Sequence, residues 1–262
     1  MTKSVKILDR TFSISGEDNY LQELAKEFEP DNVPILARLC DVESRALDVG
    51  ANIGMTALAL SRICARGRIA AVEPLPPTFQ HLQRNMTAAG ANNVNIYNFA
   101  LGNREGPVFM QGHPSNYACS FIADNYWIPR SDHFTYEVQI KRLDDCFPQL
   151  SLDRLDFMKV DVEGFELEVF EGAKDILNTY RPLVFLEMNH WCLNIYRRLS
   201  IPEFRERLMK IFPCVYALDQ LQYLDYGDER NVHRINYYHV LQFRYMNLIA
   251  GFDRDEILAR LR

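Results

Sequence analysis

The segment that most constrains the fold of this chain is a short apolar run that leads directly into a glycine-containing turn. Arg45 to Val49 reads RALDV, and Gly50 and Gly54 follow it, within an otherwise apolar stretch that continues from Ile53 to Cys64. Glycine lets a backbone turn tightly and approach a ligand closely. A buried strand, a glycine turn and a helix in this order predict one unit of a parallel α/β sheet.

The same alternation of short apolar runs and helical patterns continues along the chain. A helix is expected to begin at Pro76 and Pro77, because proline suits the first helical turn, and to end at Gly90. An amphipathic helix is expected over Gly164 to Leu177. Further strands are predicted at Arg68–Glu73, Val94–Leu101, Leu155–Asp161 and Pro182–Glu187. This order predicts an α/β fold built on one layered, parallel sheet.

Three regions flank or interrupt this pattern. Residues 1–45 read as a hairpin followed by two helices, and we treat them as an accessory segment ahead of a main domain at 46–262. Residues 106–135 combine Gly, Pro, Ser and Asn with several aromatic residues, which predicts an irregular lid inserted into that domain. Near the C-terminus a strand is predicted at Asn236–Phe243 and a last helix at Asp253–Leu261.

Polar residues follow the predicted strands at the points where each strand ends. Parallel sheets bind ligands outside the carboxyl ends of their strands, so these positions are where a site is expected. They are Asp48–Gly54, Glu73–Leu75, Asn98–Gly102, Asp161–Gly164 and Glu187–His190. Acidic, amide and glycine residues dominate them, which predicts a polar rim on an apolar scaffold.

The turn from Gly50 to Gly54 suits a nucleotide-containing cofactor. The helix that follows would present free N–H groups to an anionic group. Glu73, 23 residues after Gly50, could accept both hydroxyls of a ribose. Asn52 stands where the dinucleotide fingerprint G-x-G-x-x-G has its middle glycine. The turn therefore favours S-adenosylmethionine, while a dinucleotide and a purely structural turn stay open as alternatives.

Seven short motifs occur in order between Leu47 and Glu187. They are LDVGANIG (Leu47–Gly54), VEP (Val72–Pro74), ALGNREG (Ala100–Gly106), RLDD (Arg142–Asp145), DFMKVDVEGFE (Asp156–Glu166), GA (Gly172–Ala173) and RPLVFLE (Arg181–Glu187). The combination of GANIG with KVDVEGFE is specific, whereas either motif alone is a weaker signal. Together the motifs resemble the FkbM family of S-adenosylmethionine-dependent O-methyltransferases, over somewhat more than half of the chain.

The resemblance implies a class I methyltransferase fold, which is Rossmann-like, with a mostly parallel sheet of about seven strands and helices on both faces. It implies S-adenosylmethionine as cofactor, S-adenosylhomocysteine as product, and methyl transfer to a hydroxyl of a sugar, glycan, polyketide or similar natural product. The lid and the region after His190 carry little of the resemblance, so acceptor specificity is expected there. The expected cofactor-binding residues are Asp48, Gly50, Ala51, Asn52, Gly54, Glu73, Pro74, Asn98, Ala100, Leu101 and Asp161.

Methyl transfer to an aliphatic hydroxyl needs alignment, and a positioned general base adds roughly 10²–10⁴-fold. His190 has the best-suited intrinsic pKa and follows a predicted strand, so it is the first candidate, with a structural role as its alternative. Glu163 and Glu187 are the other candidates. Asp161, Glu187 and Asn189 would form an oxygen-rich set suited to Mg²⁺ or Ca²⁺. We expect these carboxylates to serve the cofactor, and we expect no metal to be required.

The composition of the chain argues against some classes of binding partner. Lys and Arg total 29 against 35 Asp and Glu, and the net charge of −6 argues against broad binding to nucleic acid. No stretch approaches the roughly 18 apolar residues of a spanning helix. The first residues lack the pattern of an export signal, and the six cysteines are widely spaced.

The resulting hypothesis is a cytoplasmic methyltransferase that acts on a small-molecule or glycan acceptor. Its oligomeric state is left open, and a homodimer is compatible with the sequence. A dinucleotide-dependent oxidoreductase is one alternative, and a noncatalytic binding protein with this fold is the other.

Overall fold

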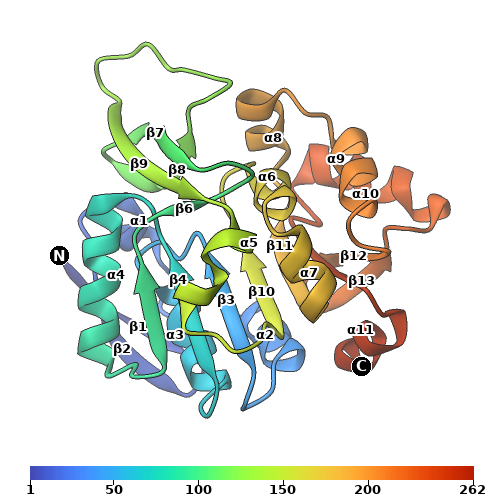
Figure 1. The fold of residues 1–262 in the computed structure, drawn as a ribbon, viewed down its shortest axis with the longest axis horizontal. Helices are drawn as coiled ribbons and strands as arrows, with labels where there is room; N and C mark the ends of the chain where they lie inside the picture. Colours follow the sequence, from blue (N-terminus) through green and yellow to red (C-terminus); the bar gives the residue numbers. More distant parts are fainter.

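The computed structural model describes residues 1 to 262 and contains three β-sheets (Figure 1). The strands of the main sheet are, in chain order, β3 (Arg45–Val49), β4 (Arg68–Val72), β5 (Val94–Tyr97), β10 (Phe157–Val160), β11 (Leu183–Glu187), β12 (Cys214–Asp219), β13 (Gln222–Asp225) and β14 (Asn247–Gly251). Their order across the sheet is β13-β12-β14-β11-β10-β3-β4-β5. The strands from β11 to β5 are mutually parallel, so their carboxyl ends lie along one edge.

The main sheet confirms the predicted α/β fold and has one strand more than expected. β14 runs antiparallel to both of its neighbours, β11 and β12. The eighth strand is β13, which forms an antiparallel hairpin with β12 at the outer edge. The expected count of about seven strands therefore describes the sheet without this edge hairpin.

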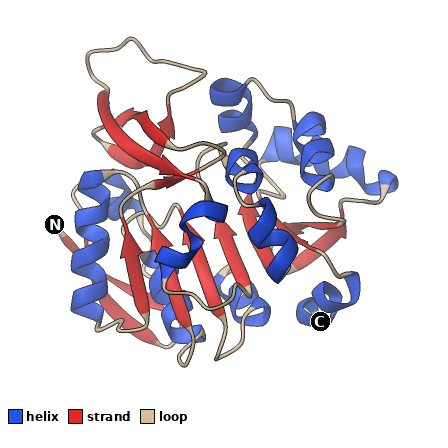
Figure 2. Ribbon diagram, viewed as in Figure 1, coloured by secondary structure: helices blue, strands red, loops and turns tan.

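Helices cover both faces of the main sheet (Figure 2). Successive side chains of a strand point to opposite faces. Leu47 and Val49 accordingly join one apolar cluster, while Ala46 joins another. The first face carries α5 (Leu143–Cys146), α6 (Glu166–Glu171), α7 (Lys174–Tyr180), α8 (His190–Arg197), α9 (Ile201–Met209) and α10 (Glu229–Gln242). The opposite face carries α2 (Val33–Leu39), α3 (Met55–Ile63), α4 (Pro76–Ala89) and α11 (Arg254–Leu261).

Local signals located one helix accurately and misjudged another. α4 begins at Pro76 and ends before Gly90, as expected. The single helix predicted over 164–177 is instead divided into α6 and α7 around Gly172. A Cβ at Gly172 would lie 1.8 Å from the carbonyl oxygen of Gly102. The helix breaks where a distant loop packs directly on its backbone.

The strand predicted at 236–243 is wrong, because these residues belong to α10 and its C-cap. Asp228 caps the helix by accepting the N–H of Arg230 at 3.0 Å. Ile235 and His239, one turn apart, form its buried side. The aromatic and β-branched residues between them suggested a strand, but helical spacing of the buried positions decides the structure.

The lid is more regular than expected. A second sheet contains β6 (Ala100–Leu101), β7 (Gly106–His113), β8 (Asn116–Ile122) and β9 (Phe134–Lys141) in the order β6-β9-β7-β8. The irregular structure predicted for 106–135 is therefore wrong over β7 and β8. Figure 1 shows this lid sheet beyond the carboxyl edge of the main sheet.

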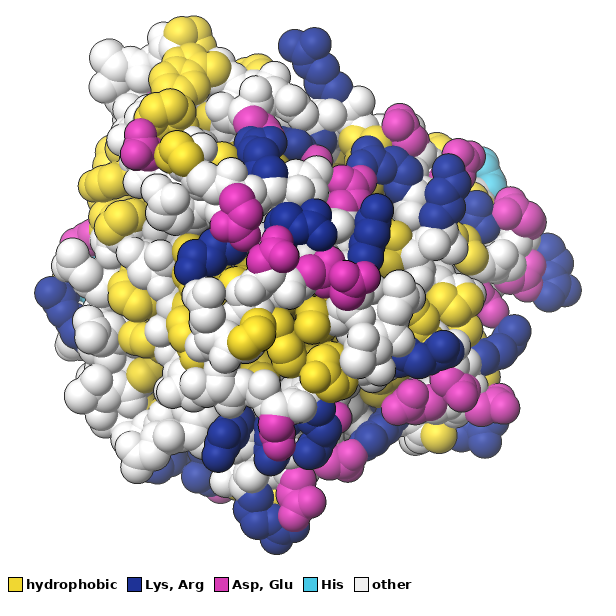
Figure 3. All heavy atoms as spheres, viewed as in Figure 1, with side chains coloured by type: hydrophobic (Ala, Val, Ile, Leu, Met, Phe, Trp, Pro, Cys, Tyr) yellow, Lys and Arg dark blue, Asp and Glu magenta, His cyan; other side chains and the backbone are white.

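The N-terminal segment has the predicted hairpin and two helices, which are β1 (Thr2–Ile7), β2 (Arg10–Ser15), α1 (Asn19–Glu23) and α2. Its hairpin packs against α4. No helix of the structure has both the length and the apolar character needed to cross a membrane. The face drawn in Figure 3 carries intermingled positive and negative side chains, with hydrophobic ones gathered over the lid.

Candidate active site

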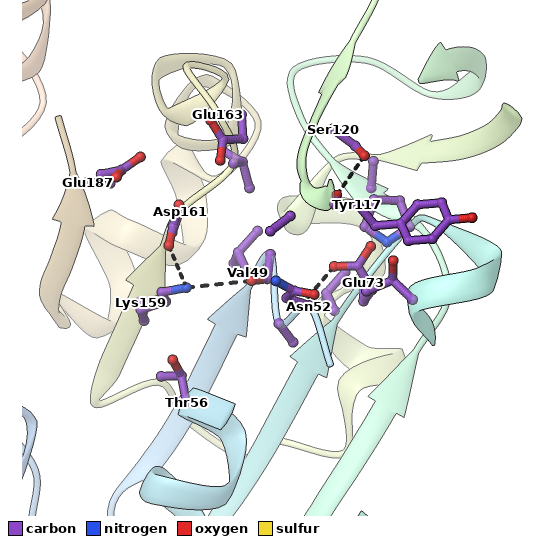
Figure 4. A pocket seen from close by; sticks show the side chains of 18 of the residues that line it. Val49, Asn52, Thr56, Glu73, Tyr117, Ser120, Lys159, Asp161, Glu163 and Glu187 are labelled. Atoms are coloured by element: carbon purple, nitrogen blue, oxygen red, sulfur yellow. Dashed lines mark hydrogen bonds and ion pairs between the residues drawn. The ribbon is translucent and has the colours of Figure 1, made fainter. Parts of the chain in front are cut away.

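A cavity lies at the carboxyl edge of the main sheet, where the ends of β3, β4, β10 and β11 meet (Figure 4). Residues of the lid sheet and of the N-terminal segment form its other walls. The predicted site residues that line it are Gly50, Ala51, Asn52, Glu73, Pro74, Ala100, Leu101, Asp161, Glu163 and Glu187. The fold thus brings together residues that are more than 100 positions apart in the sequence.

The glycine turn after β3 is held against both neighbouring strands. The N–H groups of Gly50 and Ala51 donate to the carbonyl of Val72, each at 3.0 Å. Gly50 has a φ of +78°, and a Cβ here would lie 1.9 Å from the carbonyl oxygen of Asp161. A side chain at Gly50 would therefore displace the end of β10. Gly54 is the left-handed N-cap of α3 and is not part of the cavity lining.

Glu73 closes the β4 side of the cavity. Its two carboxylate oxygens accept the N–H groups of Asn52 at 2.9 Å and Leu75 at 2.8 Å. Burial raises the pKa of Glu73 to about 7, in opposition to these hydrogen bonds. Each oxygen retains a second acceptor position, so the group fits a pair of adjacent hydroxyls such as those of ribose. Asn98 lies outside the lining, where its amide donates to the carbonyls of Glu73 and Pro74.

A lysine not anticipated from the sequence lies beneath the β10 side of the cavity. Lys159 Nζ lies 3.1 Å from Asp161 Oδ2 and 3.8 Å from Asp48 Oδ1. Burial acts to lower the pKa of Lys159, but the charges of Asp161, Asp48 and Glu29 raise it overall. Asp48 is fully buried outside the lining, and burial raises its pKa to about 6. The available signal was a lysine inside an otherwise apolar strand.

Three carboxylates gather on the β10 and β11 side of the cavity. One oxygen each of Asp161, Glu163 and Glu187 lies within 4.8 Å of the others, and Figure 4 shows the three side chains close together. Burial, and then the charge of Asp161, raises the pKa of Glu163 to about 7. The same two causes, with Glu163 added, raise the pKa of Glu187 well above its usual range. Oxygens at this spacing can ligate a divalent cation, although Lys159 already contacts Asp161.

Hydrogen bonds to the Glu166 side chain stabilise the turn that carries Glu163. Glu163 has a φ of +53°, a left-handed conformation that is uncommon for a residue with a side chain. Glu166 Oε1 accepts the N–H groups of Val162 at 3.1 Å and Gly164 at 3.2 Å. Glu166 is buried, its second oxygen has no hydrogen-bond partner, and burial raises its pKa to about 8. These bonds hold the turn so that Glu163 faces the cavity.

His190 lies outside the cavity, contrary to the prediction that made it the first candidate for the base. It is the first residue of α8, and its ring packs against those of His239 and Phe243, each with a centroid separation of 5.0 Å. Its buried Nδ1 has no hydrogen-bond partner, and burial lowers its pKa. The chain turns into α8 after β11, which directs this side chain toward α10 instead of the lid.

The lid and the N-terminal segment contribute further lining residues. Tyr117 lines the cavity from β8, where its ring packs 5.2 Å from that of Phe134. Trp127 is half-exposed and packs edge-on against Phe109 instead. Which aromatic residues of the lid line the cavity is determined by how its strands pair in three dimensions. The lining residues from these two regions are Tyr20, Phe28, Glu29, Met110, Tyr117, Ala118, Ser120 and Ile122.

Comparison with known proteins identifies the family. Residues 48–218 match the family described as the methyltransferase FkbM domain. The chain is 33% identical over 148 residues to Methyltransferase 1 of Beauveria bassiana, covering 51% of this chain and 59% of that protein. It is 27% identical over 178 residues to the hexuronic acid methyltransferase AglP of Haloferax volcanii, covering 68% of this chain and 64% of that protein. The match therefore spans less than two thirds of the length of either relative.

A solved structure shows the same fold. The crystal structure of a methyltransferase FkbM from Methylobacillus flagellatus KT matches with a TM-score of 0.50 and 16% sequence identity, covering 81% of this chain and 44% of that chain. This likeness confirms the class I methyltransferase fold expected from the sequence motifs. The matched family region covers more than half of the chain and contains the glycine turn, Glu73 and the acidic turn after β10. The chain belongs to the FkbM methyltransferase family.

Proposed function

We propose that this enzyme transfers a methyl group from S-adenosylmethionine to a hydroxyl oxygen of a sugar, glycan or related natural product. The observation that carries the proposal is a single cavity with two chemically different sides. The glycine turn and Glu73 lie on one side, and the carboxylates of Asp161, Glu163 and Glu187 lie on the other.

The first side fits the adenosine part of the methyl donor. Glu73 offers two oriented acceptors to the ribose hydroxyls, and Gly50 lines the cavity beside them. Asp161 and its acidic neighbours suit the positively charged part of the donor, because an excess of carboxylates stabilises a cation. When bound, S-adenosylmethionine supplies a methyl group that its sulfonium has already activated.

The second side provides a general base for the acceptor hydroxyl. Glu163 is the residue we assign, because it lines the cavity and its raised pKa, about 7, lies close to physiological pH. Its Oε2 also accepts the Cys192 thiol at 2.8 Å, which fixes the orientation of the carboxylate. Glu187 stands beside it as a second acidic group. We no longer propose His190 as the general base, because it does not line the cavity.

Residues of the lid and the substrate of one relative support the proposed class of methyl acceptor. Tyr117 and Ser120, which carry an aromatic ring and a hydroxyl, line the cavity from β8, a combination that suits the apolar face and polar rim of a sugar. AglP is a methyltransferase of a hexuronic acid, which carries hydroxyl and carboxyl oxygens. We therefore expect a hydroxyl-rich acceptor, with the lid setting its identity.

The test is transfer of isotopically labelled methyl from S-adenosylmethionine to a panel of hexuronic acids, neutral hexoses and hexosamines. We expect label on a uronic acid or hexose as an ether, which survives mild alkaline hydrolysis. Label that alkali releases would indicate a methyl ester, and label found only on the hexosamine nitrogen would indicate N-methylation. Either of the last two results would contradict the proposed hydroxyl acceptor.

A further inference from the structure

The cavity is completed by residues that precede the family match. That match begins at residue 48, whereas Tyr20, Phe28 and Glu29 also line the cavity. All three belong to the N-terminal segment, and none lies in a motif that suggested a methyltransferase. Their presence raises the question of which part of a ligand they contact.

The N-terminal segment is tied to the glycine turn by direct contacts. Asn85 of α4 accepts the N–H of Ser15 at 2.7 Å and donates to the carbonyl of Ile53 at 2.8 Å. Phe28 and Ala51 belong to the same buried apolar cluster. The segment therefore has a defined position relative to the floor of the cavity.

A second set of contacts ties the same segment to the lid. The carboxylate of Asp18 accepts the N–H of Tyr117 at 2.6 Å. The N–H of Asn19 donates to the carbonyl of Ser115 at 2.8 Å. Tyr20 and Glu29 consequently lie in a wall that is fixed at both the glycine turn and β8.

Hydrogen bonds place Glu29 on the side of the cavity away from Glu73. Glu29 has a φ of +38°, and its Oε2 accepts the side-chain amide of Asn32 at 3.2 Å. Asn32 Oδ1 in turn accepts the side-chain amide of Asn247 at 3.2 Å, and Asn247 pairs with Glu187 at the end of β11. In the main sheet β10 and β11 lie on one side of β3 and β4 lies on the other, so Glu29 faces the β10 side and Glu73 the β4 side.

The β10 side of the cavity carries more negative than positive charge. Lys159 Nζ lies 3.1 Å from Asp161 Oδ2 and 3.8 Å from Asp48 Oδ1, and Glu29 lines the cavity on the same side. Three carboxylates around one ammonium leave an excess of negative charge that a bound cation would balance. The adenosine part of S-adenosylmethionine carries no cation at neutral pH, whereas its amino-acid part carries an ammonium.

We propose that Glu29 is a donor-binding residue that, together with Asp161, recognises the ammonium of the amino-acid part of S-adenosylmethionine. The proposal rests on the proposed function, since it assumes that this cavity binds the methyl donor. It assigns to the N-terminal segment a direct part in cofactor binding.

Calorimetry with two ligands and two variants tests this assignment. S-adenosylhomocysteine carries the amino-acid part, whereas 5′-methylthioadenosine shares the adenosine and thioether but lacks it. Glu29→Gln removes the charge and keeps an oxygen for Asn32. Glu27→Gln is the matched control, because Glu27 is exposed and pairs with Lys6 at 3.0 Å on the surface. The thermal unfolding midpoint of each variant shows whether it folds.

We expect Glu29→Gln to weaken binding of S-adenosylhomocysteine by about tenfold or more, as for loss of a charge-assisted hydrogen bond. Its binding of 5′-methylthioadenosine and both affinities of Glu27→Gln should stay at the wild-type level. Equal affinities of Glu29→Gln and wild type, or an equal loss for both ligands, would overturn the role of Glu29 and leave the proposed function standing. A wild-type protein that binds neither ligand would overturn the proposed function and this assignment with it.

Discussion

Glu163 carries the main chemical assignment at the scale of single residues. Its conformation is held by Glu166, its carboxylate accepts the Cys192 thiol, and Asp161 and Glu187 are its nearest acidic neighbours. Because a base acts in its deprotonated form, the methyl-transfer rate should rise with pH through the pKa of Glu163, which is about 7. Burial, followed by the charge of Asp161, explains why this titration occurs near neutrality.

Glu163→Gln should lower kcat by about 10²-fold or more, because the amide cannot take a proton. It should also abolish the rise of kcat with pH, as a steady-state pH profile would show. His190→Ala is the control, and its kcat and pH profile should match the wild type, since His190 packs on α10 outside the cavity. Loss of activity in the His190 variant with a normal Glu163→Gln enzyme would reverse the assignment.

Sequence reasoning found the residues whose signals are local and missed those whose role depends on distant packing. Gly50 and Glu73 follow directly from the spacing of a strand, a turn and the next strand. Lys159 has Asp161 as a local partner, but its contact with Asp48 exists only when β10 lies beside β3. Glu29 becomes a lining residue only through the packing of the N-terminal segment against the cavity.

At the scale of elements, close contact between backbones determines where helices stop. Gly172 separates α6 from α7, and its N–H donates to the carbonyl of Glu168 while its own carbonyl accepts the N–H of Asp144. A methyl group here would collide with the carbonyl oxygen of Gly102, which is backbone and cannot rotate away. The junction therefore fixes the α6–α7 pair against the loop that follows β6.

Gly172→Ala should lower the free energy of unfolding by about 3 kcal/mol, through this overpacking. Gly90→Ala is the matched control, because Gly90 has a φ of +65° and no atom within 4 Å of an added Cβ. That control should cost only about 1 kcal/mol, from backbone strain alone. Urea denaturation of both variants measures the difference, and a Gly172 variant as stable as the Gly90 variant would contradict the packing argument.

Helices and strands were predicted correctly where their sequence signals lie within the segment itself. Pro76 and Gly90 bound α4 as expected. β7 and β8 were not predicted, because the composition of this region suggested a loop. Their stability comes from pairing of β7 with both β8 and β9. α10 was also mispredicted, because its helical form is stabilised by packing of buried residues such as Ile235 against the rest of the fold.

At the scale of the whole molecule, several buried acids predict how stability depends on pH. Burial raises the pKa of Glu73 to about 7, of Glu163 to about 7 and of Glu166 to about 8. A raised folded-state pKa means that the native protein binds more protons than the unfolded chain above about pH 4.5. Stability from these groups is full below that pH and is lost as pH rises through their folded pKa values.

His239 acts in the opposite direction at lower pH, since burial lowers its pKa to about 4. The acids should therefore dominate from pH 6.5 to 8, where the ligand-free protein should lose on the order of 2 kcal/mol of unfolding free energy. Denaturant unfolding at several pH values measures this decline. A flat or rising profile would contradict the burial of these acids in their neutral forms.

Glu166→Gln isolates one of these groups. The amide oxygen can keep the bonds to Val162 and Gly164 and cannot ionise. The slope of unfolding free energy against pH should become shallower by about 1.4 kcal/mol per pH unit, the effect of one proton. Glu137→Gln, on the exposed side of β9, should leave the slope unchanged.

The central claim is that the edge where β3, β4 and β10 meet binds an adenosine-containing methyl donor. Titration of the protein with S-adenosylhomocysteine in a calorimeter tests it most directly, with NADH as the competing cofactor class. We expect saturable binding of one S-adenosylhomocysteine per chain, weakened by Glu73→Gln and unaffected by NADH. Binding of NADH without S-adenosylhomocysteine, or binding of S-adenosylhomocysteine that ignores the loss of Glu73, would contradict it.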